Sequence, residues 1–156
     1  MRSALILLLV LINFSCQKDA LMSAVPDVEG SWKFSGYKLN EEAPLTNPCD
    51  QAIVTLNIAS SPDGYSITGT SFINTYFSKV SFAIDHTKRA GTIEMAAVGS
   101  TKMGGPDNLM QCESNYYVNL KNINNFMLDG QTLYLYRNLT PQNPGNDSPI
   151  LVFERN

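Results

Sequence analysis

Few residues of this sequence have the types and spacing that chemistry at a site requires, and the single histidine comes first among them. His86 follows Asp85, and with one of the serines the pair could form a hydrolase site. Such a site needs a nucleophile within about 3 Å of a base that a third group orients. The sequence has no Gly-x-Ser-x-Gly elbow. We therefore interpret residues 85–88 as a polar hairpin loop, and a lone imidazole excludes a zinc site built from several histidines.

The glycine-rich stretch at residues 99–105 is a second candidate, because such loops can cradle phosphate. In a phosphate loop the lysine and the hydroxyl residue follow the last glycine, at the start of a helix. Here Thr101 and Lys102 precede Gly104, so the order is wrong. Lys102 beside a helix N-terminus leaves a weaker anion site open, although Asp107 already occupies that positive end. We interpret the stretch as a structural turn into a helix.

The N-terminal residues combine a positive charge with an apolar run. Arg2 precedes nine consecutive apolar residues, 4–12, and Ser15 stands directly before Cys16. Nine residues cannot cross a bilayer, which needs about 20, but they suit the apolar region of a signal peptide. A small residue before a cysteine here resembles a bacterial lipoprotein processing site, with Asn13 where an aliphatic residue is usual. The resemblance implies removal of residues 1–15 and lipidation of Cys16, for example with palmitate. The alternative is an ordinary secretory signal with an incidental cysteine.

Residues 16–27 are then a lipidated cysteine and a flexible tether. Gln17-Lys18-Asp19 resembles the tether by which Bacteroidetes lipoproteins are routed to the cell surface. Each buried CH₂ of an acyl chain contributes about 0.8 kcal/mol, so two or three chains make a durable anchor. We expect a location at the outer membrane or cell surface, with the membrane as a partner through the N-terminal acyl chains.

Cys49 and Cys112 are the other two cysteines. In an exported protein an even pair is more often a disulfide than a metal site. The alternative is two separate buried thiols, because Cys112 lies on the apolar stripe of a predicted helix. We expect the disulfide, and we expect no cofactor and no metal.

Composition limits the remaining possibilities. The chain has 156 residues, of which 44% are hydrophobic, enough for one packed domain at residues 28–156. Its formal net charge is −3, which leaves no excess of cations to hold a phosphate backbone, so nucleic-acid binding is not expected.

Period-two alternation of apolar and polar residues dominates the body and predicts eight short strands. The alternating segments lie near 30–35, 54–58, 65–68, 80–84, 93–97, 126–128, 133–136 and 150–153. Between residues 106 and 123 the apolar spacing changes to three and four, which predicts one helix. We therefore predict a mainly β (α+β) fold: an antiparallel, eight-stranded, barrel-like sheet with one packed α-helix between strands five and six, covering an opening.

The residues that carry a family resemblance stand in a glycine-x-tryptophan strand, a glycine-asparagine strand and a threonine-basic-methionine turn before the helix: Gly30, Trp32, Gly69, Asn74, Thr101, Lys102 and Met103. Residues 129–135 and 151–153 resemble the family's closing strands. Over residues 28–156 the chain is similar to the META domain, the HslJ-like family of bacterial envelope and heat-shock-associated proteins. The resemblance implies the barrel fold and a link to envelope stress. Two cysteines frequent in the family are replaced, in the 71–73 segment and at Gly104, so no shared redox feature is implied.

Function is predicted in outline only. We expect a non-catalytic, lipid-anchored module that binds an envelope partner, and not an enzyme. The alternative is a lipocalin-like carrier of a small apolar ligand, because a glycine-x-tryptophan strand also opens lipocalins. Six aromatic residues could line such a ligand cavity or else fill the core and rim: Tyr76, Phe77, Tyr116, Tyr117, Tyr134 and Tyr136.

Overall fold

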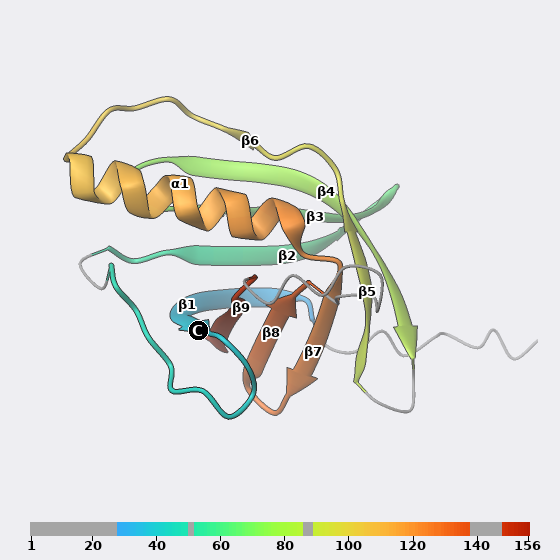
Figure 1. Cartoon of the computed structure of the whole chain (residues 1–156). Helices are drawn as coiled ribbons and strands as arrows, with labels where there is room; N and C mark the ends of the chain where they lie inside the picture. Colours follow the sequence, from blue (N-terminus) through green and yellow to red (C-terminus); the bar gives the residue numbers. More distant parts are fainter. Residues whose placement is uncertain (1–27, 50–51, 86–88, 138–147) are drawn as a thin grey trace, which may run out of the picture.

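The structure is a computed structural model that describes residues 28–49, 52–85, 89–137 and 148–156. The expected signal peptide, Cys16, the tether and His86 lie outside these residues. Within the described ranges the chain forms the following elements (Figure 1): β1 (Gly30–Lys38), β2 (Thr55–Ser61), β3 (Gly64–Thr70), β4 (Thr75–Asp85), β5 (Ala90–Met95), β6 (Gly99–Ser100), α1 (Asp107–Asn122), β7 (Asn125–Asp129), β8 (Thr132–Tyr136) and β9 (Ile150–Arg155).

Eight of these strands close into one antiparallel barrel, which confirms the predicted fold. The strands pair in the order β1, β2, β3, β4, β5, β7, β8 and β9, and β9 pairs back with β1. The two-residue β6 was not predicted. It pairs with β4 at Tyr76 and Phe77, on the edge where β5 also pairs, and so lengthens that edge. Among the described strands, closure leaves no long unpaired edge on which another chain could add a strand.

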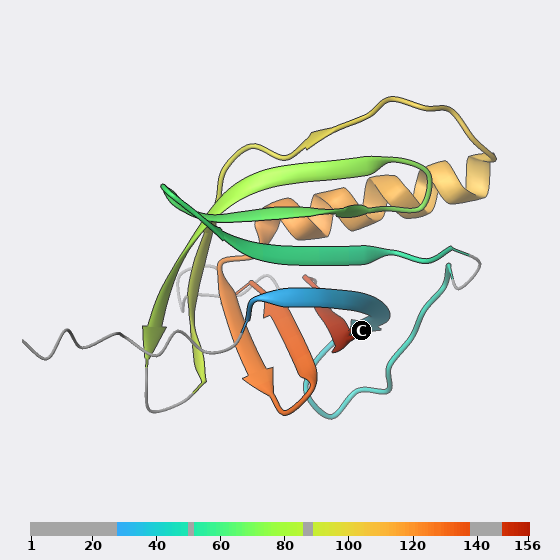
Figure 2. The same ribbon diagram turned by 180° about the vertical axis from the view of Figure 1, so that it is seen from behind.

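The helix α1 lies within one residue of the predicted boundaries at both ends. It starts after Pro106 and carries Asp107 in its first turn, where a negative charge suits the helix dipole. Tyr116 and Leu120, from the predicted apolar stripe, are fully buried. Both ribbon views show α1 lying against one face of β2, β3 and β4, with the segment around β6 running along the edge beyond β4, with which β6 pairs (Figures 1 and 2).

Tyr116 connects the helix to the barrel core. Its ring makes edge-on contacts with Phe34 on β1 at 5.5 Å between centroids, with Tyr76 on β4 at 5.8 Å and with Phe72 at 6.2 Å. Such aromatic pairs add about 0.5–1.5 kcal/mol beyond the area they bury. The helix therefore covers the opening by inserting an aromatic side chain into it. The largest side chains in the core that are less than 2% exposed are Trp32, Tyr76, Tyr116, Phe126 and Phe153.

Candidate functional site

A buried group of hydrogen-bonded polar residues forms around Asn74, which stands directly before β4. Its side-chain Oδ1 accepts a hydrogen bond from the Thr101 hydroxyl at 2.8 Å and another from the Met103 backbone N–H at 2.7 Å. Its Nδ2 donates to Oε2 of Glu113 on α1 at 2.6 Å. Asn74 is only 5% exposed. One amide therefore joins the turn after β3, the segment after β6 and the helix.

Glu113 binds the same turn through its other carboxylate oxygen. Oε1 accepts from the Ser71 hydroxyl, from the Ile73 backbone N–H at 3.1 Å and from the Asn74 backbone N–H at 2.8 Å. The residue is buried, with 8% of its surface exposed. We call the hydrogen-bonded set Ser71, Asn74, Thr101, Met103 and Glu113 the Asn74–Glu113 network.

In the Asn74–Glu113 network, the Glu113 carboxylate is an anion that neutral hydrogen-bond donors surround. Burial, the largest single cause, raises the pKa of Glu113. Hydrogen bonds from Ser71, from the Asn74 side chain and from the backbone of Asn74 and Ile73 lower it and together outweigh burial, so the pKa lies below its usual value. Glu113 is ionised at neutral pH and is no proton donor there. Its lone pairs are directed at the chain's own donors, which is the geometry of a structural clamp.

Tyrosine hydroxyls extend this hydrogen bonding into the core. Tyr117 pairs with Ser71 at 2.9 Å between oxygens, and Tyr76 pairs with Tyr116 at 2.8 Å while donating to the Thr55 carbonyl at 2.8 Å. Burial, the largest cause, raises the pKa of Tyr76 and of Tyr116 above the usual value of 10.0. These phenols stay protonated at physiological pH and act as fixed hydrogen-bonding groups.

Gly69 is required by the close approach of two neighbouring groups. A Cβ there would lie 2.0 Å from the Thr55 carbonyl oxygen and 2.8 Å from the Tyr76 ring. Only a residue without a side chain allows Thr55 and Tyr76 to form their hydrogen bond across this position.

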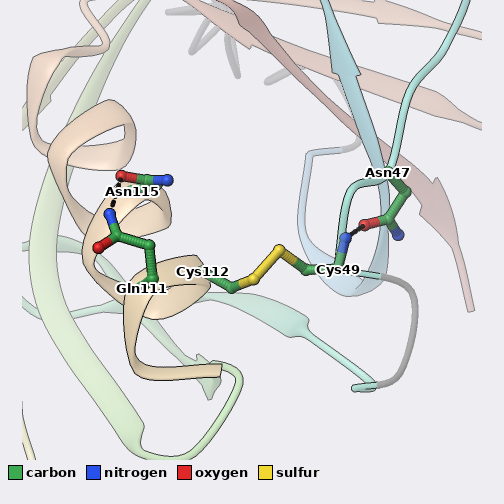
Figure 3. The surroundings of a disulfide bond; sticks show 5 residues. All are labelled: Asn47, Cys49, Gln111, Cys112 and Asn115. Carbon is green, nitrogen blue, oxygen red and sulfur yellow. Dashed lines mark hydrogen bonds between the residues drawn. A yellow bond between two sulfur atoms is a disulfide. The ribbon is translucent and has the colours of Figure 1, made fainter. Parts of the chain in front are cut away.

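Cys49 and Cys112 are joined in a disulfide, with their Cα atoms 6.2 Å apart and a separation of 63 positions in the sequence. Figure 3 shows the bond reaching from the β1–β2 connection to the first half of α1. The Cys49 backbone N–H also donates to Asn47 Oδ1 at 3.2 Å. The predicted pairing is therefore present, and it fixes the connection to the helix that carries Glu113.

A family model described as the META domain matches residues 27–144. The chain belongs to the META domain family. A solved structure, the NMR structure of a protein from Burkholderia xenovorans, is 23% identical, has a TM-score of 0.56 and covers 82% of this chain and 82% of its own. That similarity shows the shared fold. No curated protein matches the chain.

Three further residues of the META resemblance, Gly30, Trp32 and Lys102, are not part of the Asn74–Glu113 network. Gly30, with φ of 127°, and Trp32 start β1. The Trp32 indole N–H donates to the Val28 carbonyl at 2.9 Å, and the Arg155 guanidinium lies 4.4 Å from the ring centroid. Lys102 is exposed and forms no ion pair or hydrogen bond with a described residue.

The META signature read from sequence missed Ser71, Glu113 and Tyr117. Glu113 stands four positions after Leu109 and three before Tyr116, which places a carboxylate on the apolar stripe of the helix. An acidic residue at such a position is rarely buried unless it is paired. The position of Glu113 within the apolar stripe was therefore the sequence signal that could have identified it as a buried, hydrogen-bonded residue.

Other types of site find little support in the described part of the chain. No three histidine, cysteine, aspartate or glutamate side chains gather there where they could hold a metal ion. The described residues also contain no helix with the length and apolar character needed to cross a bilayer. The aromatic residues divide between core and surface: Tyr76 and Tyr116 are buried, whereas Phe77 is 63% exposed.

Proposed function

We propose that the chain is a lipid-anchored cell-envelope protein whose META domain is a non-catalytic binding module. The observation that carries this proposal is the Asn74–Glu113 network. The Glu113 carboxylate and the Asn74 amide are saturated by the chain's own donors and acceptors, so neither is free to act as a base or nucleophile. A fold whose polar signature is used internally acts through its outer surface.

The anchor in this proposal is Cys16, after removal of residues 1–15. An apolar run of signal-peptide length directly before a small residue and a cysteine supports it. Mass spectrometry of the mature N-terminus should find Cys16 carrying acyl chains, with the protein in the outer membrane or at the cell surface. The Cys16→Ala variant should lose both the acyl mass and the membrane fraction. An unmodified N-terminus beyond residue 16 would contradict the anchor.

The carrier alternative requires a chamber along the barrel axis. The described core is instead packed with aromatic side chains, among them Trp32, Phe126 and Phe153, each fully buried. The helix also lies between β6 and β7 rather than after the last strand, where lipocalins have it. Within the described core, an apolar ligand would have to displace these packed rings, so we favour the binding module.

Crosslinking in intact cells tests the binding module. A tagged full chain should capture the same envelope partner reproducibly, with greater yield under at least one envelope stress. The Cys16→Ala variant is the matched control, because it keeps the folded domain and loses the proposed location. Absence of any reproducible partner under several stresses would contradict the proposal.

A further inference from the structure

A cleft of about 260 Å³ crosses the outer surface of the barrel over β1, β9, β8 and β7. Its floor is formed by Met127, Tyr134, Tyr136 and Ile150, and Glu41 and Asp129 stand at its rim. Ligand pockets for drug-sized molecules run from roughly 300 to 1,000 Å³. This cleft suits a smaller ligand or one part of a longer one.

The alternation of β8 places two tyrosines in the cleft. Leu133 and Leu135 are buried in the barrel, so Tyr134 and Tyr136 face outward, about 7 Å apart along the strand. Tyr134 lies opposite Met127 on β7. Both tyrosines are half-buried, which leaves part of each ring accessible over an apolar floor.

The polar ends of four side chains stand around this floor. Within the described residues, neither the two phenol hydroxyls nor the carboxylates of Glu41 and Asp129 have a hydrogen-bond or ion-pair partner. The Lys38 ammonium is engaged, because it donates to the Glu41 backbone carbonyl.

The rim position of Glu41 is held by the turn that follows β1. Asn40 Oδ1 accepts from the backbone N–H of Glu42 at 3.0 Å and of Ala43 at 2.7 Å. This turn fixes the backbone on both sides of Glu41 before any ligand arrives, which lowers the ordering cost of binding.

We propose that this cleft binds a neutral saccharide, an inference that rests on the proposed binding module and names its ligand class. Sugar hydroxyls both donate and accept, and the cleft offers acceptors in Glu41 and Asp129 and donors in the two phenols. The C–H face of a pyranose ring packs against an aromatic ring. Two carboxylates and one ammonium give the lining a net charge of −1, which disfavours an acidic ligand.

Calorimetric titration of the mature full chain in detergent micelles tests this proposal. The probes are β-1,4-linked tetramers of glucose and of N-acetylglucosamine, with an acidic galacturonate tetramer and octalysine for comparison. At least one neutral tetramer should bind with a millimolar or tighter Kd. Tyr136→Ala should raise that Kd by about tenfold, and Glu41→Gln, on an exposed turn, should raise it several-fold without any effect on folding. Phe77→Ala, an exposed aromatic outside the cleft, should leave it unchanged.

Three results would overturn the saccharide cleft: binding of neither neutral tetramer, binding that survives both Tyr136→Ala and Glu41→Gln, or stronger binding of octalysine than of both tetramers. The binding module fails separately. If the Tyr136→Ala variant still captures the envelope partner that the wild-type chain captures, the binding module stands and its binding surface lies elsewhere. If no partner is captured by the wild-type chain, the module itself is contradicted.

Discussion

Replacing Glu113 with glutamine keeps the size of the side chain and removes the charge at the centre of the Asn74–Glu113 network. The carboxylate accepts four hydrogen bonds, from the Ser71 hydroxyl, the Ile73 and Asn74 backbone N–H groups and the Asn74 side chain. The glutamine NH₂ must face at least one of these donors. Turning the Asn74 amide to relieve that contact would direct its own NH₂ at the Met103 N–H.

The expected cost follows from this mismatch. Hydrogen bonds to charged groups contribute about 1.5–3 kcal/mol each, against about 1 kcal/mol for neutral ones, and an unsatisfied buried donor costs about 1–3 kcal/mol. We expect Glu113→Gln to lower the free energy of unfolding by about 2–4 kcal/mol at pH 7. A domain of this size is usually stable by about 5–15 kcal/mol, so the variant should remain folded.

The effect should also depend on pH with a definite sign. Because the folded-state pKa of Glu113 lies below its usual value of 4.5, the unfolded chain binds the proton more readily. The stabilisation is fully present above pH 4.5 and is lost as the pH falls through the folded-state pKa. Glutamine has no such proton. The difference between wild type and variant should therefore shrink in acid.

Urea unfolding of both proteins at pH 7 and at several values below pH 4.5 measures this difference. Glu94→Gln, at an exposed position on β5, is the control and should change stability by less than about 0.5 kcal/mol. A Glu113→Gln effect below about 0.5 kcal/mol at pH 7, or an effect of constant size down to acid pH, would refute the clamp role.

Two further predictions concern the disulfide and a signature glycine. Replacing Cys49 and Cys112 with alanine should lower the free energy of unfolding by about 4 kcal/mol, since the two cysteines are 63 positions apart and the bond closes a long loop. Urea unfolding of the variant measures this loss. A thiol titration of the native protein checks the bond itself, and two free thiols would count against it. Gly69→Ala should lower the melting temperature, with a cost of about 1–3 kcal/mol or more, because the added Cβ would meet the Thr55 carbonyl at 2.0 Å. Gly104→Ala, with open space around the added Cβ, is the matched control, and equal melting temperatures for the two variants would contradict the packing explanation.

The barrel and the helix were predictable because their signals are local and periodic. The apolar stripe between residues 106 and 123 placed α1 to within a residue, and alternation such as that of Leu133 and Leu135 located the strands. The short β6 was missed, because two residues carry no alternation. It exists only because β4 is longer than β5 and offers an unpaired edge at Tyr76 and Phe77.

The site was predictable only in part. Asn74, Thr101 and Met103 were identified through the family resemblance, but nothing local in the sequence says that residues 27 positions apart share hydrogen bonds. Their meeting depends on closure of the barrel and on the docking of α1, which are tertiary events. Glu113 was missed because a single acidic residue on an apolar stripe does not disturb the helical period.

Hydrogen exchange of three backbone amides tests the clamp most directly. The N–H groups of Ile73 and Asn74 donate to Glu113, and that of Met103 donates to Asn74, although all three residues lie outside strands and helices. If the signature residues hold the fold together, these amides should exchange as slowly as those of the core strands, through global unfolding. Exchange at the rate of an exposed loop, with the core strands still protected, would contradict the account.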